Sequence, residues 1–195
     1  RLKTGTVGVA SSCRTMEIDS IKVDAPKAED LLNLARGKGT RQSSYGWGST
    51  DGRRAVDGNA NSHYGHASCT HTQNNDKAWW RVDLGGPRAI SKIKILNRGD
   101  CCGSRLGNFE IQIGMDDVPG SDSNGNNAKC KDSTKPMSGT NFYPSGMPQG
   151  SFTTFECDKT MVGQFVYIQL SGRDYLTLCE VEVYGKIGNV LSNWN

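Results

Sequence analysis

Apolar and polar residues alternate along five short segments of this 195-residue chain. A period of two places the apolar side chains on one face of a β-strand, so each segment predicts a strand with one buried face. Polar, glycine-rich stretches separate the segments, and residues 116–150 predict long surface loops. The pattern predicts an all-β fold, a β-sandwich or jelly roll of antiparallel strands with long loops. The apolar positions are Trp80, Val82 and Leu84; Ile93 and Ile95; Phe109, Ile111 and Ile113; Val166, Ile168 and Leu170; and Cys179, Val181 and Val183.

The first part of the chain has a different pattern. Residues 16–23 alternate apolar and polar side chains and predict a short strand, and residues 28–35 predict two helical turns. We interpret residues 1–31 as a short N-terminal extension and a candidate oligomerisation segment. Residues 32–186 are then the folded domain, and residues 187–195 a C-terminal tail.

The composition of the chain argues against some classes of function and indicates a cellular location. The net charge is only +3, which argues against binding to nucleic acid, and no run approaches the roughly 20 apolar residues of a membrane span. Seven cysteines favour an oxidising compartment, so we expect a secreted, extracellular protein; the start at Arg1 fits a removed signal peptide or a shortened chain. An odd number leaves one cysteine over, and Cys13 stands far from the others. It could link two chains or be free.

The most informative motif is the run Arg98-Gly99-Asp100-Cys101-Cys102-Gly103-Ser104-Arg105. Neighbouring Cα atoms lie about 3.8 Å apart, closer than the roughly 4.4–6.8 Å usual for a disulfide. A bridge between Cys101 and Cys102 would close a strained eight-membered ring, and strain is concentrated at functional sites. Two guanidinium groups beside such a sulfur surface predict recognition of a small polar ligand.

A histidine adds to this motif. His71 lies on a polar loop 27 residues before Arg98, and Arg105 follows Arg98 by 7 residues. The loop with both arginines begins where the strand of Ile95 ends, and loops at one end of a sandwich can share a pocket. Arginine and histidine donors suit the hydroxyls and ring oxygen of a sugar, and Asp100 would orient one guanidinium. These residues predict a sugar site with the disulfide as an apolar platform.

Residues 33–185 resemble the F-type lectins, the fucose-binding lectins first known from eel. The resemblance rests on this spacing, on the adjacent cysteines and on the strand Trp79–Leu84. It implies a discoidin-like jelly roll without catalysis that binds terminal α-L-fucose on glycans. Because single sugar sites bind weakly, we also expect a homo-oligomer. Roles in innate immunity, fertilisation and toxin-associated modules occur in the family. The implied site consists of His71, Arg98 and Arg105 as donors to the axial 4-hydroxyl, the ring oxygen and neighbouring oxygens, the Cys101–Cys102 disulfide against the sugar ring, and Tyr64 near the fucose methyl group.

Family members also hold a structural calcium ion, which takes carboxylate, hydroxyl and carbonyl oxygens. The resemblance also implies two disulfides besides the adjacent pair, Cys69–Cys179 and Cys130–Cys157. The implied calcium ligands are Arg54, Asn59, Ser68 and Cys179 through backbone or side-chain oxygens, and Asp57 and Glu180 through carboxylates.

Other functions have weaker support. Arg98-Gly99-Asp100 is also an integrin-type tripeptide, which makes a cell-adhesion module the first alternative. A discoidin-type module that binds lipid or protein through its loop tips is the second, but the candidate tips, residues 45–47 and 63–64, are too polar to favour membrane insertion. His63, His66 and His71 lack the spacing of a zinc site. No Gly-x-Ser-x-Gly, P-loop or His-Glu-x-x-His motif occurs, so an enzyme is the weakest alternative.

Overall fold

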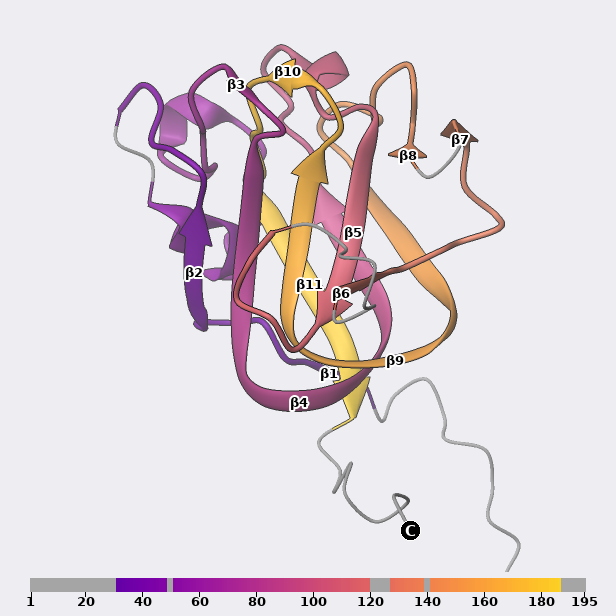
Figure 1. Cartoon of the computed structure of the whole chain (residues 1–195). Helices are drawn as coiled ribbons and strands as arrows, with labels where there is room; N and C mark the ends of the chain where they lie inside the picture. The colour runs from indigo at the N-terminus through magenta and orange to yellow at the C-terminus, as the bar shows by residue number, and fades with distance from the viewer. Residues whose placement is uncertain (1–30, 49–50, 120–126, 139–140, 187–195) are drawn as a thin grey trace, which may run out of the picture.

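The computed structural model describes residues 31–48, 51–119, 127–138 and 141–186 (Figure 1). Within these ranges no helix is long and apolar enough to cross a membrane. The described residues include three short 3-10 helices: η2 (Gly52–Val56), η3 (Tyr64–His66) and η4 (Gly103–Arg105). The strands are β1 (Leu32–Asn33), β2 (Gly39–Gln42), β3 (Asn75–Asp76), β4 (Trp79–Leu96), β5 (Phe109–Gly114), β6 (Asn127–Lys129), β7 (Met137–Ser138), β8 (Asn141–Phe142), β9 (Phe152–Leu170), β10 (Arg173–Asp174) and β11 (Glu180–Lys186).

Two long antiparallel strands, β4 and β9, form the frame of the fold. Two of the strands predicted from the sequence are the two halves of β4, which runs for 18 residues. Its pairing with β9 is interrupted between Asp83 and Arg88, where Gly85 and Gly86 have φ angles of 78° and 149°. Such angles favour glycine, so this pair lets β4 turn sharply without strain. Figure 1 shows both strands turning at the lower end of the molecule.

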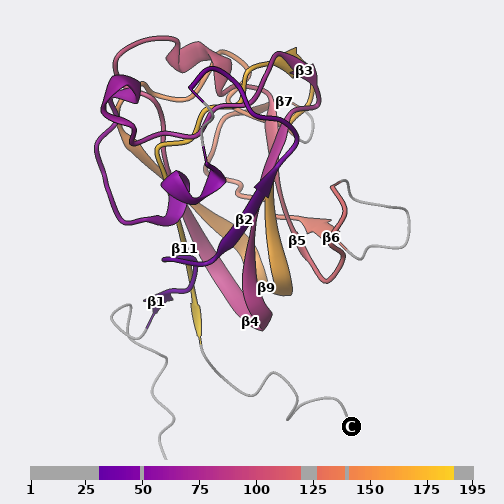
Figure 2. The ribbon, with the colours of Figure 1, turned by 90° about the vertical axis from the view of Figure 1, so that its left-hand side faces the viewer.

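This turn folds the hydrogen-bonded sheet into two layers. The first half of β4 pairs with β2 and the second half of β9 with β5, while the second half of β4 pairs with β11. Seen from the side, β1 and β11 lie on one side of the molecule and β5 and β6 on the other (Figure 2). The antiparallel β-sandwich predicted from the sequence is confirmed.

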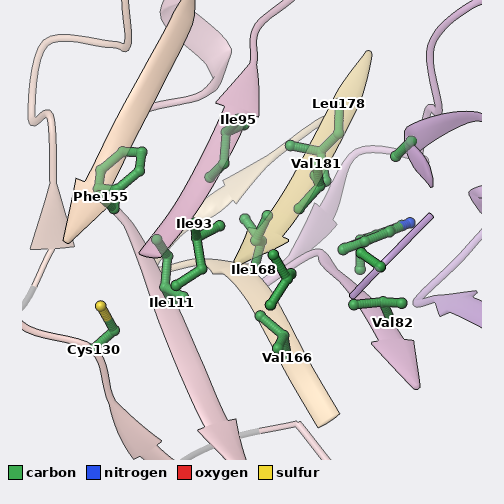
Figure 3. Close-up of a cluster of buried hydrophobic side chains, with 14 of the residues drawn as sticks. Val82, Ile93, Ile95, Ile111, Cys130, Phe155, Val166, Ile168, Leu178 and Val181 are labelled. Atoms are coloured by element: carbon green, nitrogen blue, oxygen red, sulfur yellow. The ribbon is translucent and has the colours of Figure 1, made fainter. Parts of the chain in front are cut away.

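The core fills the space between the layers. All the apolar positions of the five predicted segments are buried, each with at most 2% of its surface exposed. Figure 3 shows Val82 and Ile168 from one layer facing Ile93 and Val181 from the other. The period-two pattern therefore identified the core correctly, because each layer buries one face.

The helical prediction for residues 28–35 is wrong where the structure describes it. Leu32 and Asn33 form β1, paired with Gly185 and Tyr184 of β11. The Asn33 side chain accepts hydrogen bonds from the backbone N–H groups of Ala35 and of a residue in β11, so the local sequence favours an edge strand here. Residues 28–30, the predicted strand at residues 16–23 and Cys13 lie outside the described residues.

The prediction that residues 116–150 hold long surface loops is incomplete. The stretch also contains the short strands β6, β7 and β8, and Phe142 and Met147 are 0% and 2% exposed. The Phe142 ring packs against Phe109 and Phe155, with ring centroids 5.7 and 4.9 Å away. Strands of two or three residues are too short to show a period in the sequence, so only their packing reveals them.

We expect Phe142→Ala to lower the free energy of unfolding by about 3–5 kcal/mol, because it leaves a cavity between two buried aromatic rings. Chemical denaturation measures this change. Val118→Ala, at a side chain 58% exposed in the same stretch, is the control and should change stability by less than about 0.5 kcal/mol. Equal stabilities of the two variants would contradict the packing described here.

Candidate functional site

The loop of residues 98–105 begins directly after β4 and is braced by Asn97. This side chain is 1% exposed, and its Nδ2 donates to the carbonyl oxygens of Gly103 and Met147, both at 2.9 Å. Its Oδ1 accepts a hydrogen bond of 2.8 Å from the backbone N–H of Arg98. A buried amide with three satisfied hydrogen bonds fixes the path of the loop at both ends.

A second brace comes from the segment before β9. Gln149 donates to the carbonyl oxygen of Gly99 at 2.8 Å and accepts from the N–H of Gly103 at 3.2 Å. A Cβ atom at Gly99 would lie 2.4 Å from Ser62 Oγ and 3.0 Å from the Cα atom of Gly150, so this close approach favours glycine. Sequence patterns gave no sign of Gln149, which lies in the stretch predicted to be surface loop.

The two adjacent cysteines are joined. The Cys101–Cys102 disulfide is present, and both residues are partly exposed. Cys102 has a φ angle of 60°, a left-handed conformation uncommon for a residue with a side chain. It directly precedes η4, and its carbonyl oxygen accepts from the N–H of Arg105, the last residue of η4. The disulfide therefore presents a fixed sulfur surface between the two arginines of the loop.

Arg98 and Asp100 bind each other within this loop. Arg98 Nε and Nη2 donate to the two carboxylate oxygens at 2.9 and 2.7 Å, and the two side chains are only 13% and 18% exposed. This pairing holds the pKa of Asp100 well below its usual range. The carboxylate also accepts from the backbone N–H of Tyr64 at 2.9 Å, and the guanidinium carbon lies 4.4 Å from the centre of the Tyr64 ring. The two charged side chains of the tripeptide suggested as an adhesion signal are thus already paired with each other.

His71 lies between two tyrosine rings and is 6% exposed. The ring centres of Tyr64 and Tyr175 are 5.4 and 5.2 Å from the centre of its imidazole. Burial lowers the pKa of His71, and the charges of the two site arginines lower it further, against an opposing effect of the Thr72 carbonyl. His71 Nδ1 lies 2.5 Å from this carbonyl oxygen. Since a carbonyl only accepts, Nδ1 carries the proton, and Nε2 is the acceptor of the neutral ring.

Arg105 lies near His71 and packs against the second of its two tyrosine neighbours, Tyr175. Its guanidinium carbon lies 4.6 Å from the centre of the Tyr175 ring, and its Nε lies 3.9 Å from Asp174 Oδ1. The structure therefore brings together the predicted residues His71, Arg98 and Arg105. Tyr175 was not predicted, because it follows β10 in a polar segment without a recognisable motif.

The residues predicted to bind calcium meet at a separate place. Glu180 at the start of β11 is 2% exposed and accepts from the Gly58 N–H at 3.2 Å, next to Asp57. Burial and the Asp57 carboxylate raise the pKa of Glu180 to about 7. A buried carboxylate next to an exposed one that repels it is a donor set that a hard cation would stabilise.

The other predicted ligands lie near this pair in the chain or through a disulfide. Arg54 lies in η2, the helix that ends directly before Asp57, and the N–H of Asn59 donates to an Asp57 carboxylate oxygen at 2.8 Å. The Cys69–Cys179 disulfide joins the segment of Ser68 to the start of β11. In the described residues no cluster of three His, Cys, Asp or Glu side chains occurs, so any further oxygens must be main-chain, amide or hydroxyl groups. The third implied disulfide, Cys130–Cys157, is also present, and all three pairings are confirmed.

Comparison with known proteins agrees with this geometry. Residues 54–168 match the NedA-like, galactose-binding domain family. Fucolectin-3 of Anguilla japonica is 37% identical over 174 residues, which cover 87% of each chain.

Solved structures give the same result. An F-lectin from striped bass (Morone saxatilis) serum has 38% identity and a TM-score of 0.67; the match covers 81% of this chain and about half, 48%, of that one. The lectin domain of lectinolysin in complex with Lewis B antigen has 32% identity and a TM-score of 0.63, and the match covers 80% of this chain and 97% of that one. These relatives are lectins rather than enzymes. The chain therefore belongs to the fucolectin family, the F-type lectins, and has their galactose-binding-domain fold.

Proposed function

We propose that this protein is a secreted lectin that binds terminal α-L-fucose on glycans. The observation that carries the proposal is the grouping of His71, Arg98 and Arg105 around two tyrosine rings beside the Cys101–Cys102 disulfide. Polar groups that converge on partly exposed apolar surfaces suit a sugar ring, which has hydroxyls at its edge and C–H groups on its faces.

Each polar residue has a distinct role in this proposal. Asp100 occupies Nε and Nη2 of Arg98, so the guanidinium is oriented with Nη1 as the donor to the sugar. Arg105 supplies a second fork of donors. His71 Nε2 accepts the proton of the axial 4-hydroxyl, because Nδ1 already donates to Thr72. The resemblance had suggested a donor at His71; the contact to Thr72 favours an acceptor.

Apolar contacts complete the proposed fucose site. The disulfide provides a polarisable surface for the C–H groups of the ring, and Tyr64 offers an aromatic edge to the methyl group of fucose. The names of the eel relatives, and the Lewis B antigen bound to the lectinolysin domain, support fucosylated glycans as ligands. Three disulfides in the described residues support an oxidising, extracellular location. Single sugar sites bind weakly, so we infer an assembly of identical chains that gains avidity.

A structural calcium ion is the second part of the proposal. Asp57 and Glu180 would hold it with their carboxylates, and Arg54, Asn59, Ser68 and Cys179 would add oxygens. The raised pKa of Glu180 supports this assignment, because a bound cation would offset both the burial and the repulsion by Asp57 that raise it. The ion would stabilise the segment between η2 and η3, which carries Tyr64 on its far end. Its effect is therefore on stability and on the position of the site.

The adhesion alternative has less support. An Arg-Gly-Asp signal must present both charged side chains to its partner, whereas Arg98 and Asp100 form a bidentate pair with little exposed surface. Separation of this pair would leave two charges without partners.

A glycan array tests the proposed ligand. We expect binding to be confined to fucosylated glycans and abolished by Arg98→Ala, which removes the oriented donor. Arg98→Lys keeps the charge but not the planar fork, and should weaken binding at least about tenfold. Arg53→Ala, at an exposed Arg–Asp pair in η2, is the matched control and should bind as the wild type does. Binding to unfucosylated glycans, or cell adhesion that persists in excess free fucose, would contradict the proposal.

The affinity for fucose should depend on pH through His71. Its pKa is lowered from about 6.5, so the ring stays neutral above that pH and Nε2 remains an acceptor. We expect constant affinity from pH 8 to about 6.5 and a progressive loss at lower pH, where the ring gains a proton between two arginines. Asp100 remains ionised throughout this range because its pKa is lowered. Calorimetric titration of methyl α-L-fucoside measures the profile, and an affinity that rises on acidification would exclude the acceptor role.

Removal of calcium should destabilise the fold. At a calcium concentration 100 times the dissociation constant, binding adds about 2.7 kcal/mol, so a chelator should lower the melting temperature by about 5–10 °C. Glu180→Gln should reduce this response, whereas Glu182→Gln, which changes a partly exposed carboxylate on the same strand, should retain it. Scanning calorimetry with and without chelator measures both. An identical melting temperature for the wild type in the two conditions would disprove the calcium site.

A further inference from the structure

A cavity of about 590 Å³ lies beside β6 and β9, away from the proposed fucose site. Met161 on its wall pairs with Ile90, close to the turn of β4. The residues of the fucose site instead lie near the two ends of the ladder, at Leu96 and Trp79. Figure 1 shows β6 in the lower half of the molecule and β3 and β10 at its top. The volume is within the range of about 300–1,000 Å³ for small-molecule pockets, so this cavity can hold a ligand of its own.

The floor of the cavity is apolar and continuous with the core. Ala128, Cys157 and Met161 contribute it. Cys157 is bonded to Cys130, which is 3% exposed and belongs to the buried core cluster (Figure 3). Met161 is 7% exposed and belongs to the same cluster. An apolar ligand group that covers this floor would remove both its own surface and that of the floor from water.

The two sides of the cavity are fixed to each other. The Asp158 N–H in β9 donates to the Lys131 carbonyl oxygen at 2.6 Å. Asp132, only 2% exposed, accepts a hydrogen bond of 2.9 Å at its carboxylate from the N–H of Glu156 in β9. Together with the disulfide, these bonds hold the segment after β6 against β9. The shape of the cavity therefore exists before a ligand arrives, which lowers the entropic cost of binding.

Three lysines line this cavity above the apolar floor. Lys129 forms an ion pair of 2.7 Å with Glu110. Lys131 and Lys159 are exposed, and among the residues that the structure describes neither forms an ion pair. Asp158 also belongs to the lining, but one of its carboxylate oxygens accepts from a backbone N–H at 3.1 Å. The cavity therefore combines an excess of positive charge with an apolar floor.

We propose that this cavity binds a small amphiphilic anion, in which a carboxylate, sulfonate or phosphate group ends an apolar chain or ring system. The ammonium groups of Lys131 and Lys159 would hold the anionic group through charge-assisted hydrogen bonds. The apolar part would cover the floor, and the methylene stems of the lysines would extend that surface. The site shares no residue with the proposed fucose site and does not depend on it.

The same features argue against a larger anionic partner. A sulfated polysaccharide carries charges along its whole length and needs a row of cations, whereas this cavity offers two unpaired ammonium groups beside apolar atoms. A membrane needs apolar side chains that project into it, whereas the Met161 side chain of the floor is buried. A small molecule with one anionic end matches both the number of charges and the recessed floor.

Two fluorescent probes test the proposal on the full chain: 8-anilinonaphthalene-1-sulfonate, and N-phenyl-1-naphthylamine, which has the same rings without the sulfonate. We expect the double variant Lys131→Gln, Lys159→Gln to bind the sulfonate about three- to tenfold more weakly than the wild type. Its affinity for the uncharged probe should be unchanged, because the floor remains. Lys77→Gln, at an exposed lysine near the other end of β9, is the matched control and should bind both probes as the wild type does.

A competition experiment identifies the kind of anion. Decanoate below its micellar concentration should displace the sulfonate probe from the wild type, whereas decan-1-ol at the same concentration should not. An unchanged affinity of the double variant for the sulfonate, or an equal loss for both probes, would overturn the proposal. Displacement by heparin but not by decanoate would assign the lysines to a polyanion and overturn it. Lysine-dependent binding to phosphatidylserine vesicles without displacement by decanoate would assign them to a membrane, with the same consequence.

Discussion

The antiparallel ladder between β4 and β9 determines the rest of the structure, because both of its ends contribute to the site. At one end Leu96 pairs with Phe152, so the loop after β4 lies beside the segment that precedes β9. At the other end Trp79 pairs with Gln169, so the segment of His71 lies beside that of Tyr175. The ladder turns where its register is interrupted, which brings its two ends to the same end of the sandwich (Figure 1). A straight ladder of this length would hold them far apart.

Two features could be predicted from the sequence: the core positions, which repeat regularly along each strand, and the polar site residues, which belong to a specific motif. The period-two pattern identified the core positions, since each half of the bent ladder buries one face (Figure 3). The run of Arg98 to Arg105 with His71 was recognisable because few sequences place these groups at this spacing, and the family resemblance supplied the disulfide pairings. The core and the polar side chains of the site therefore follow from local patterns along the chain.

Other parts depend on contacts that no sequence pattern encodes. Phe142 belongs to a two-residue strand, which is too short to show a period, and it is buried through rings contributed by distant segments. Gln149 braces the site loop through main-chain contacts, for which any amide at the right place would serve. Tyr175 contacts His71 only because Trp79 pairs with Gln169, which places the segments before β4 and after β9 side by side. These residues act through tertiary geometry, so propensity and spacing give no signal for them.

The balance of charge in the site explains why a neutral polyol suits it better than an anion. Asp100 already neutralises Arg98 through two hydrogen bonds, and Asp174 lies 3.9 Å from Arg105 as a weaker counter-charge. An anion would have to compete with these carboxylates for the same guanidinium groups. It would also face the lone pair of neutral His71, whose pKa is lowered and which therefore does not offer a proton.

A hydroxyl group is the chemical partner that fits both kinds of residue at once. It accepts a hydrogen bond from a guanidinium and donates its own proton to the imidazole, so neither interaction requires a change of charge. The pairing of Arg98 with Asp100 fixes the direction of the donor, and the contact of His71 with Thr72 fixes the acceptor, before a ligand arrives. In the proposed function, the site would thus select by the direction of each hydrogen bond, because a ring whose hydroxyls have the wrong orientation would leave these groups unsatisfied.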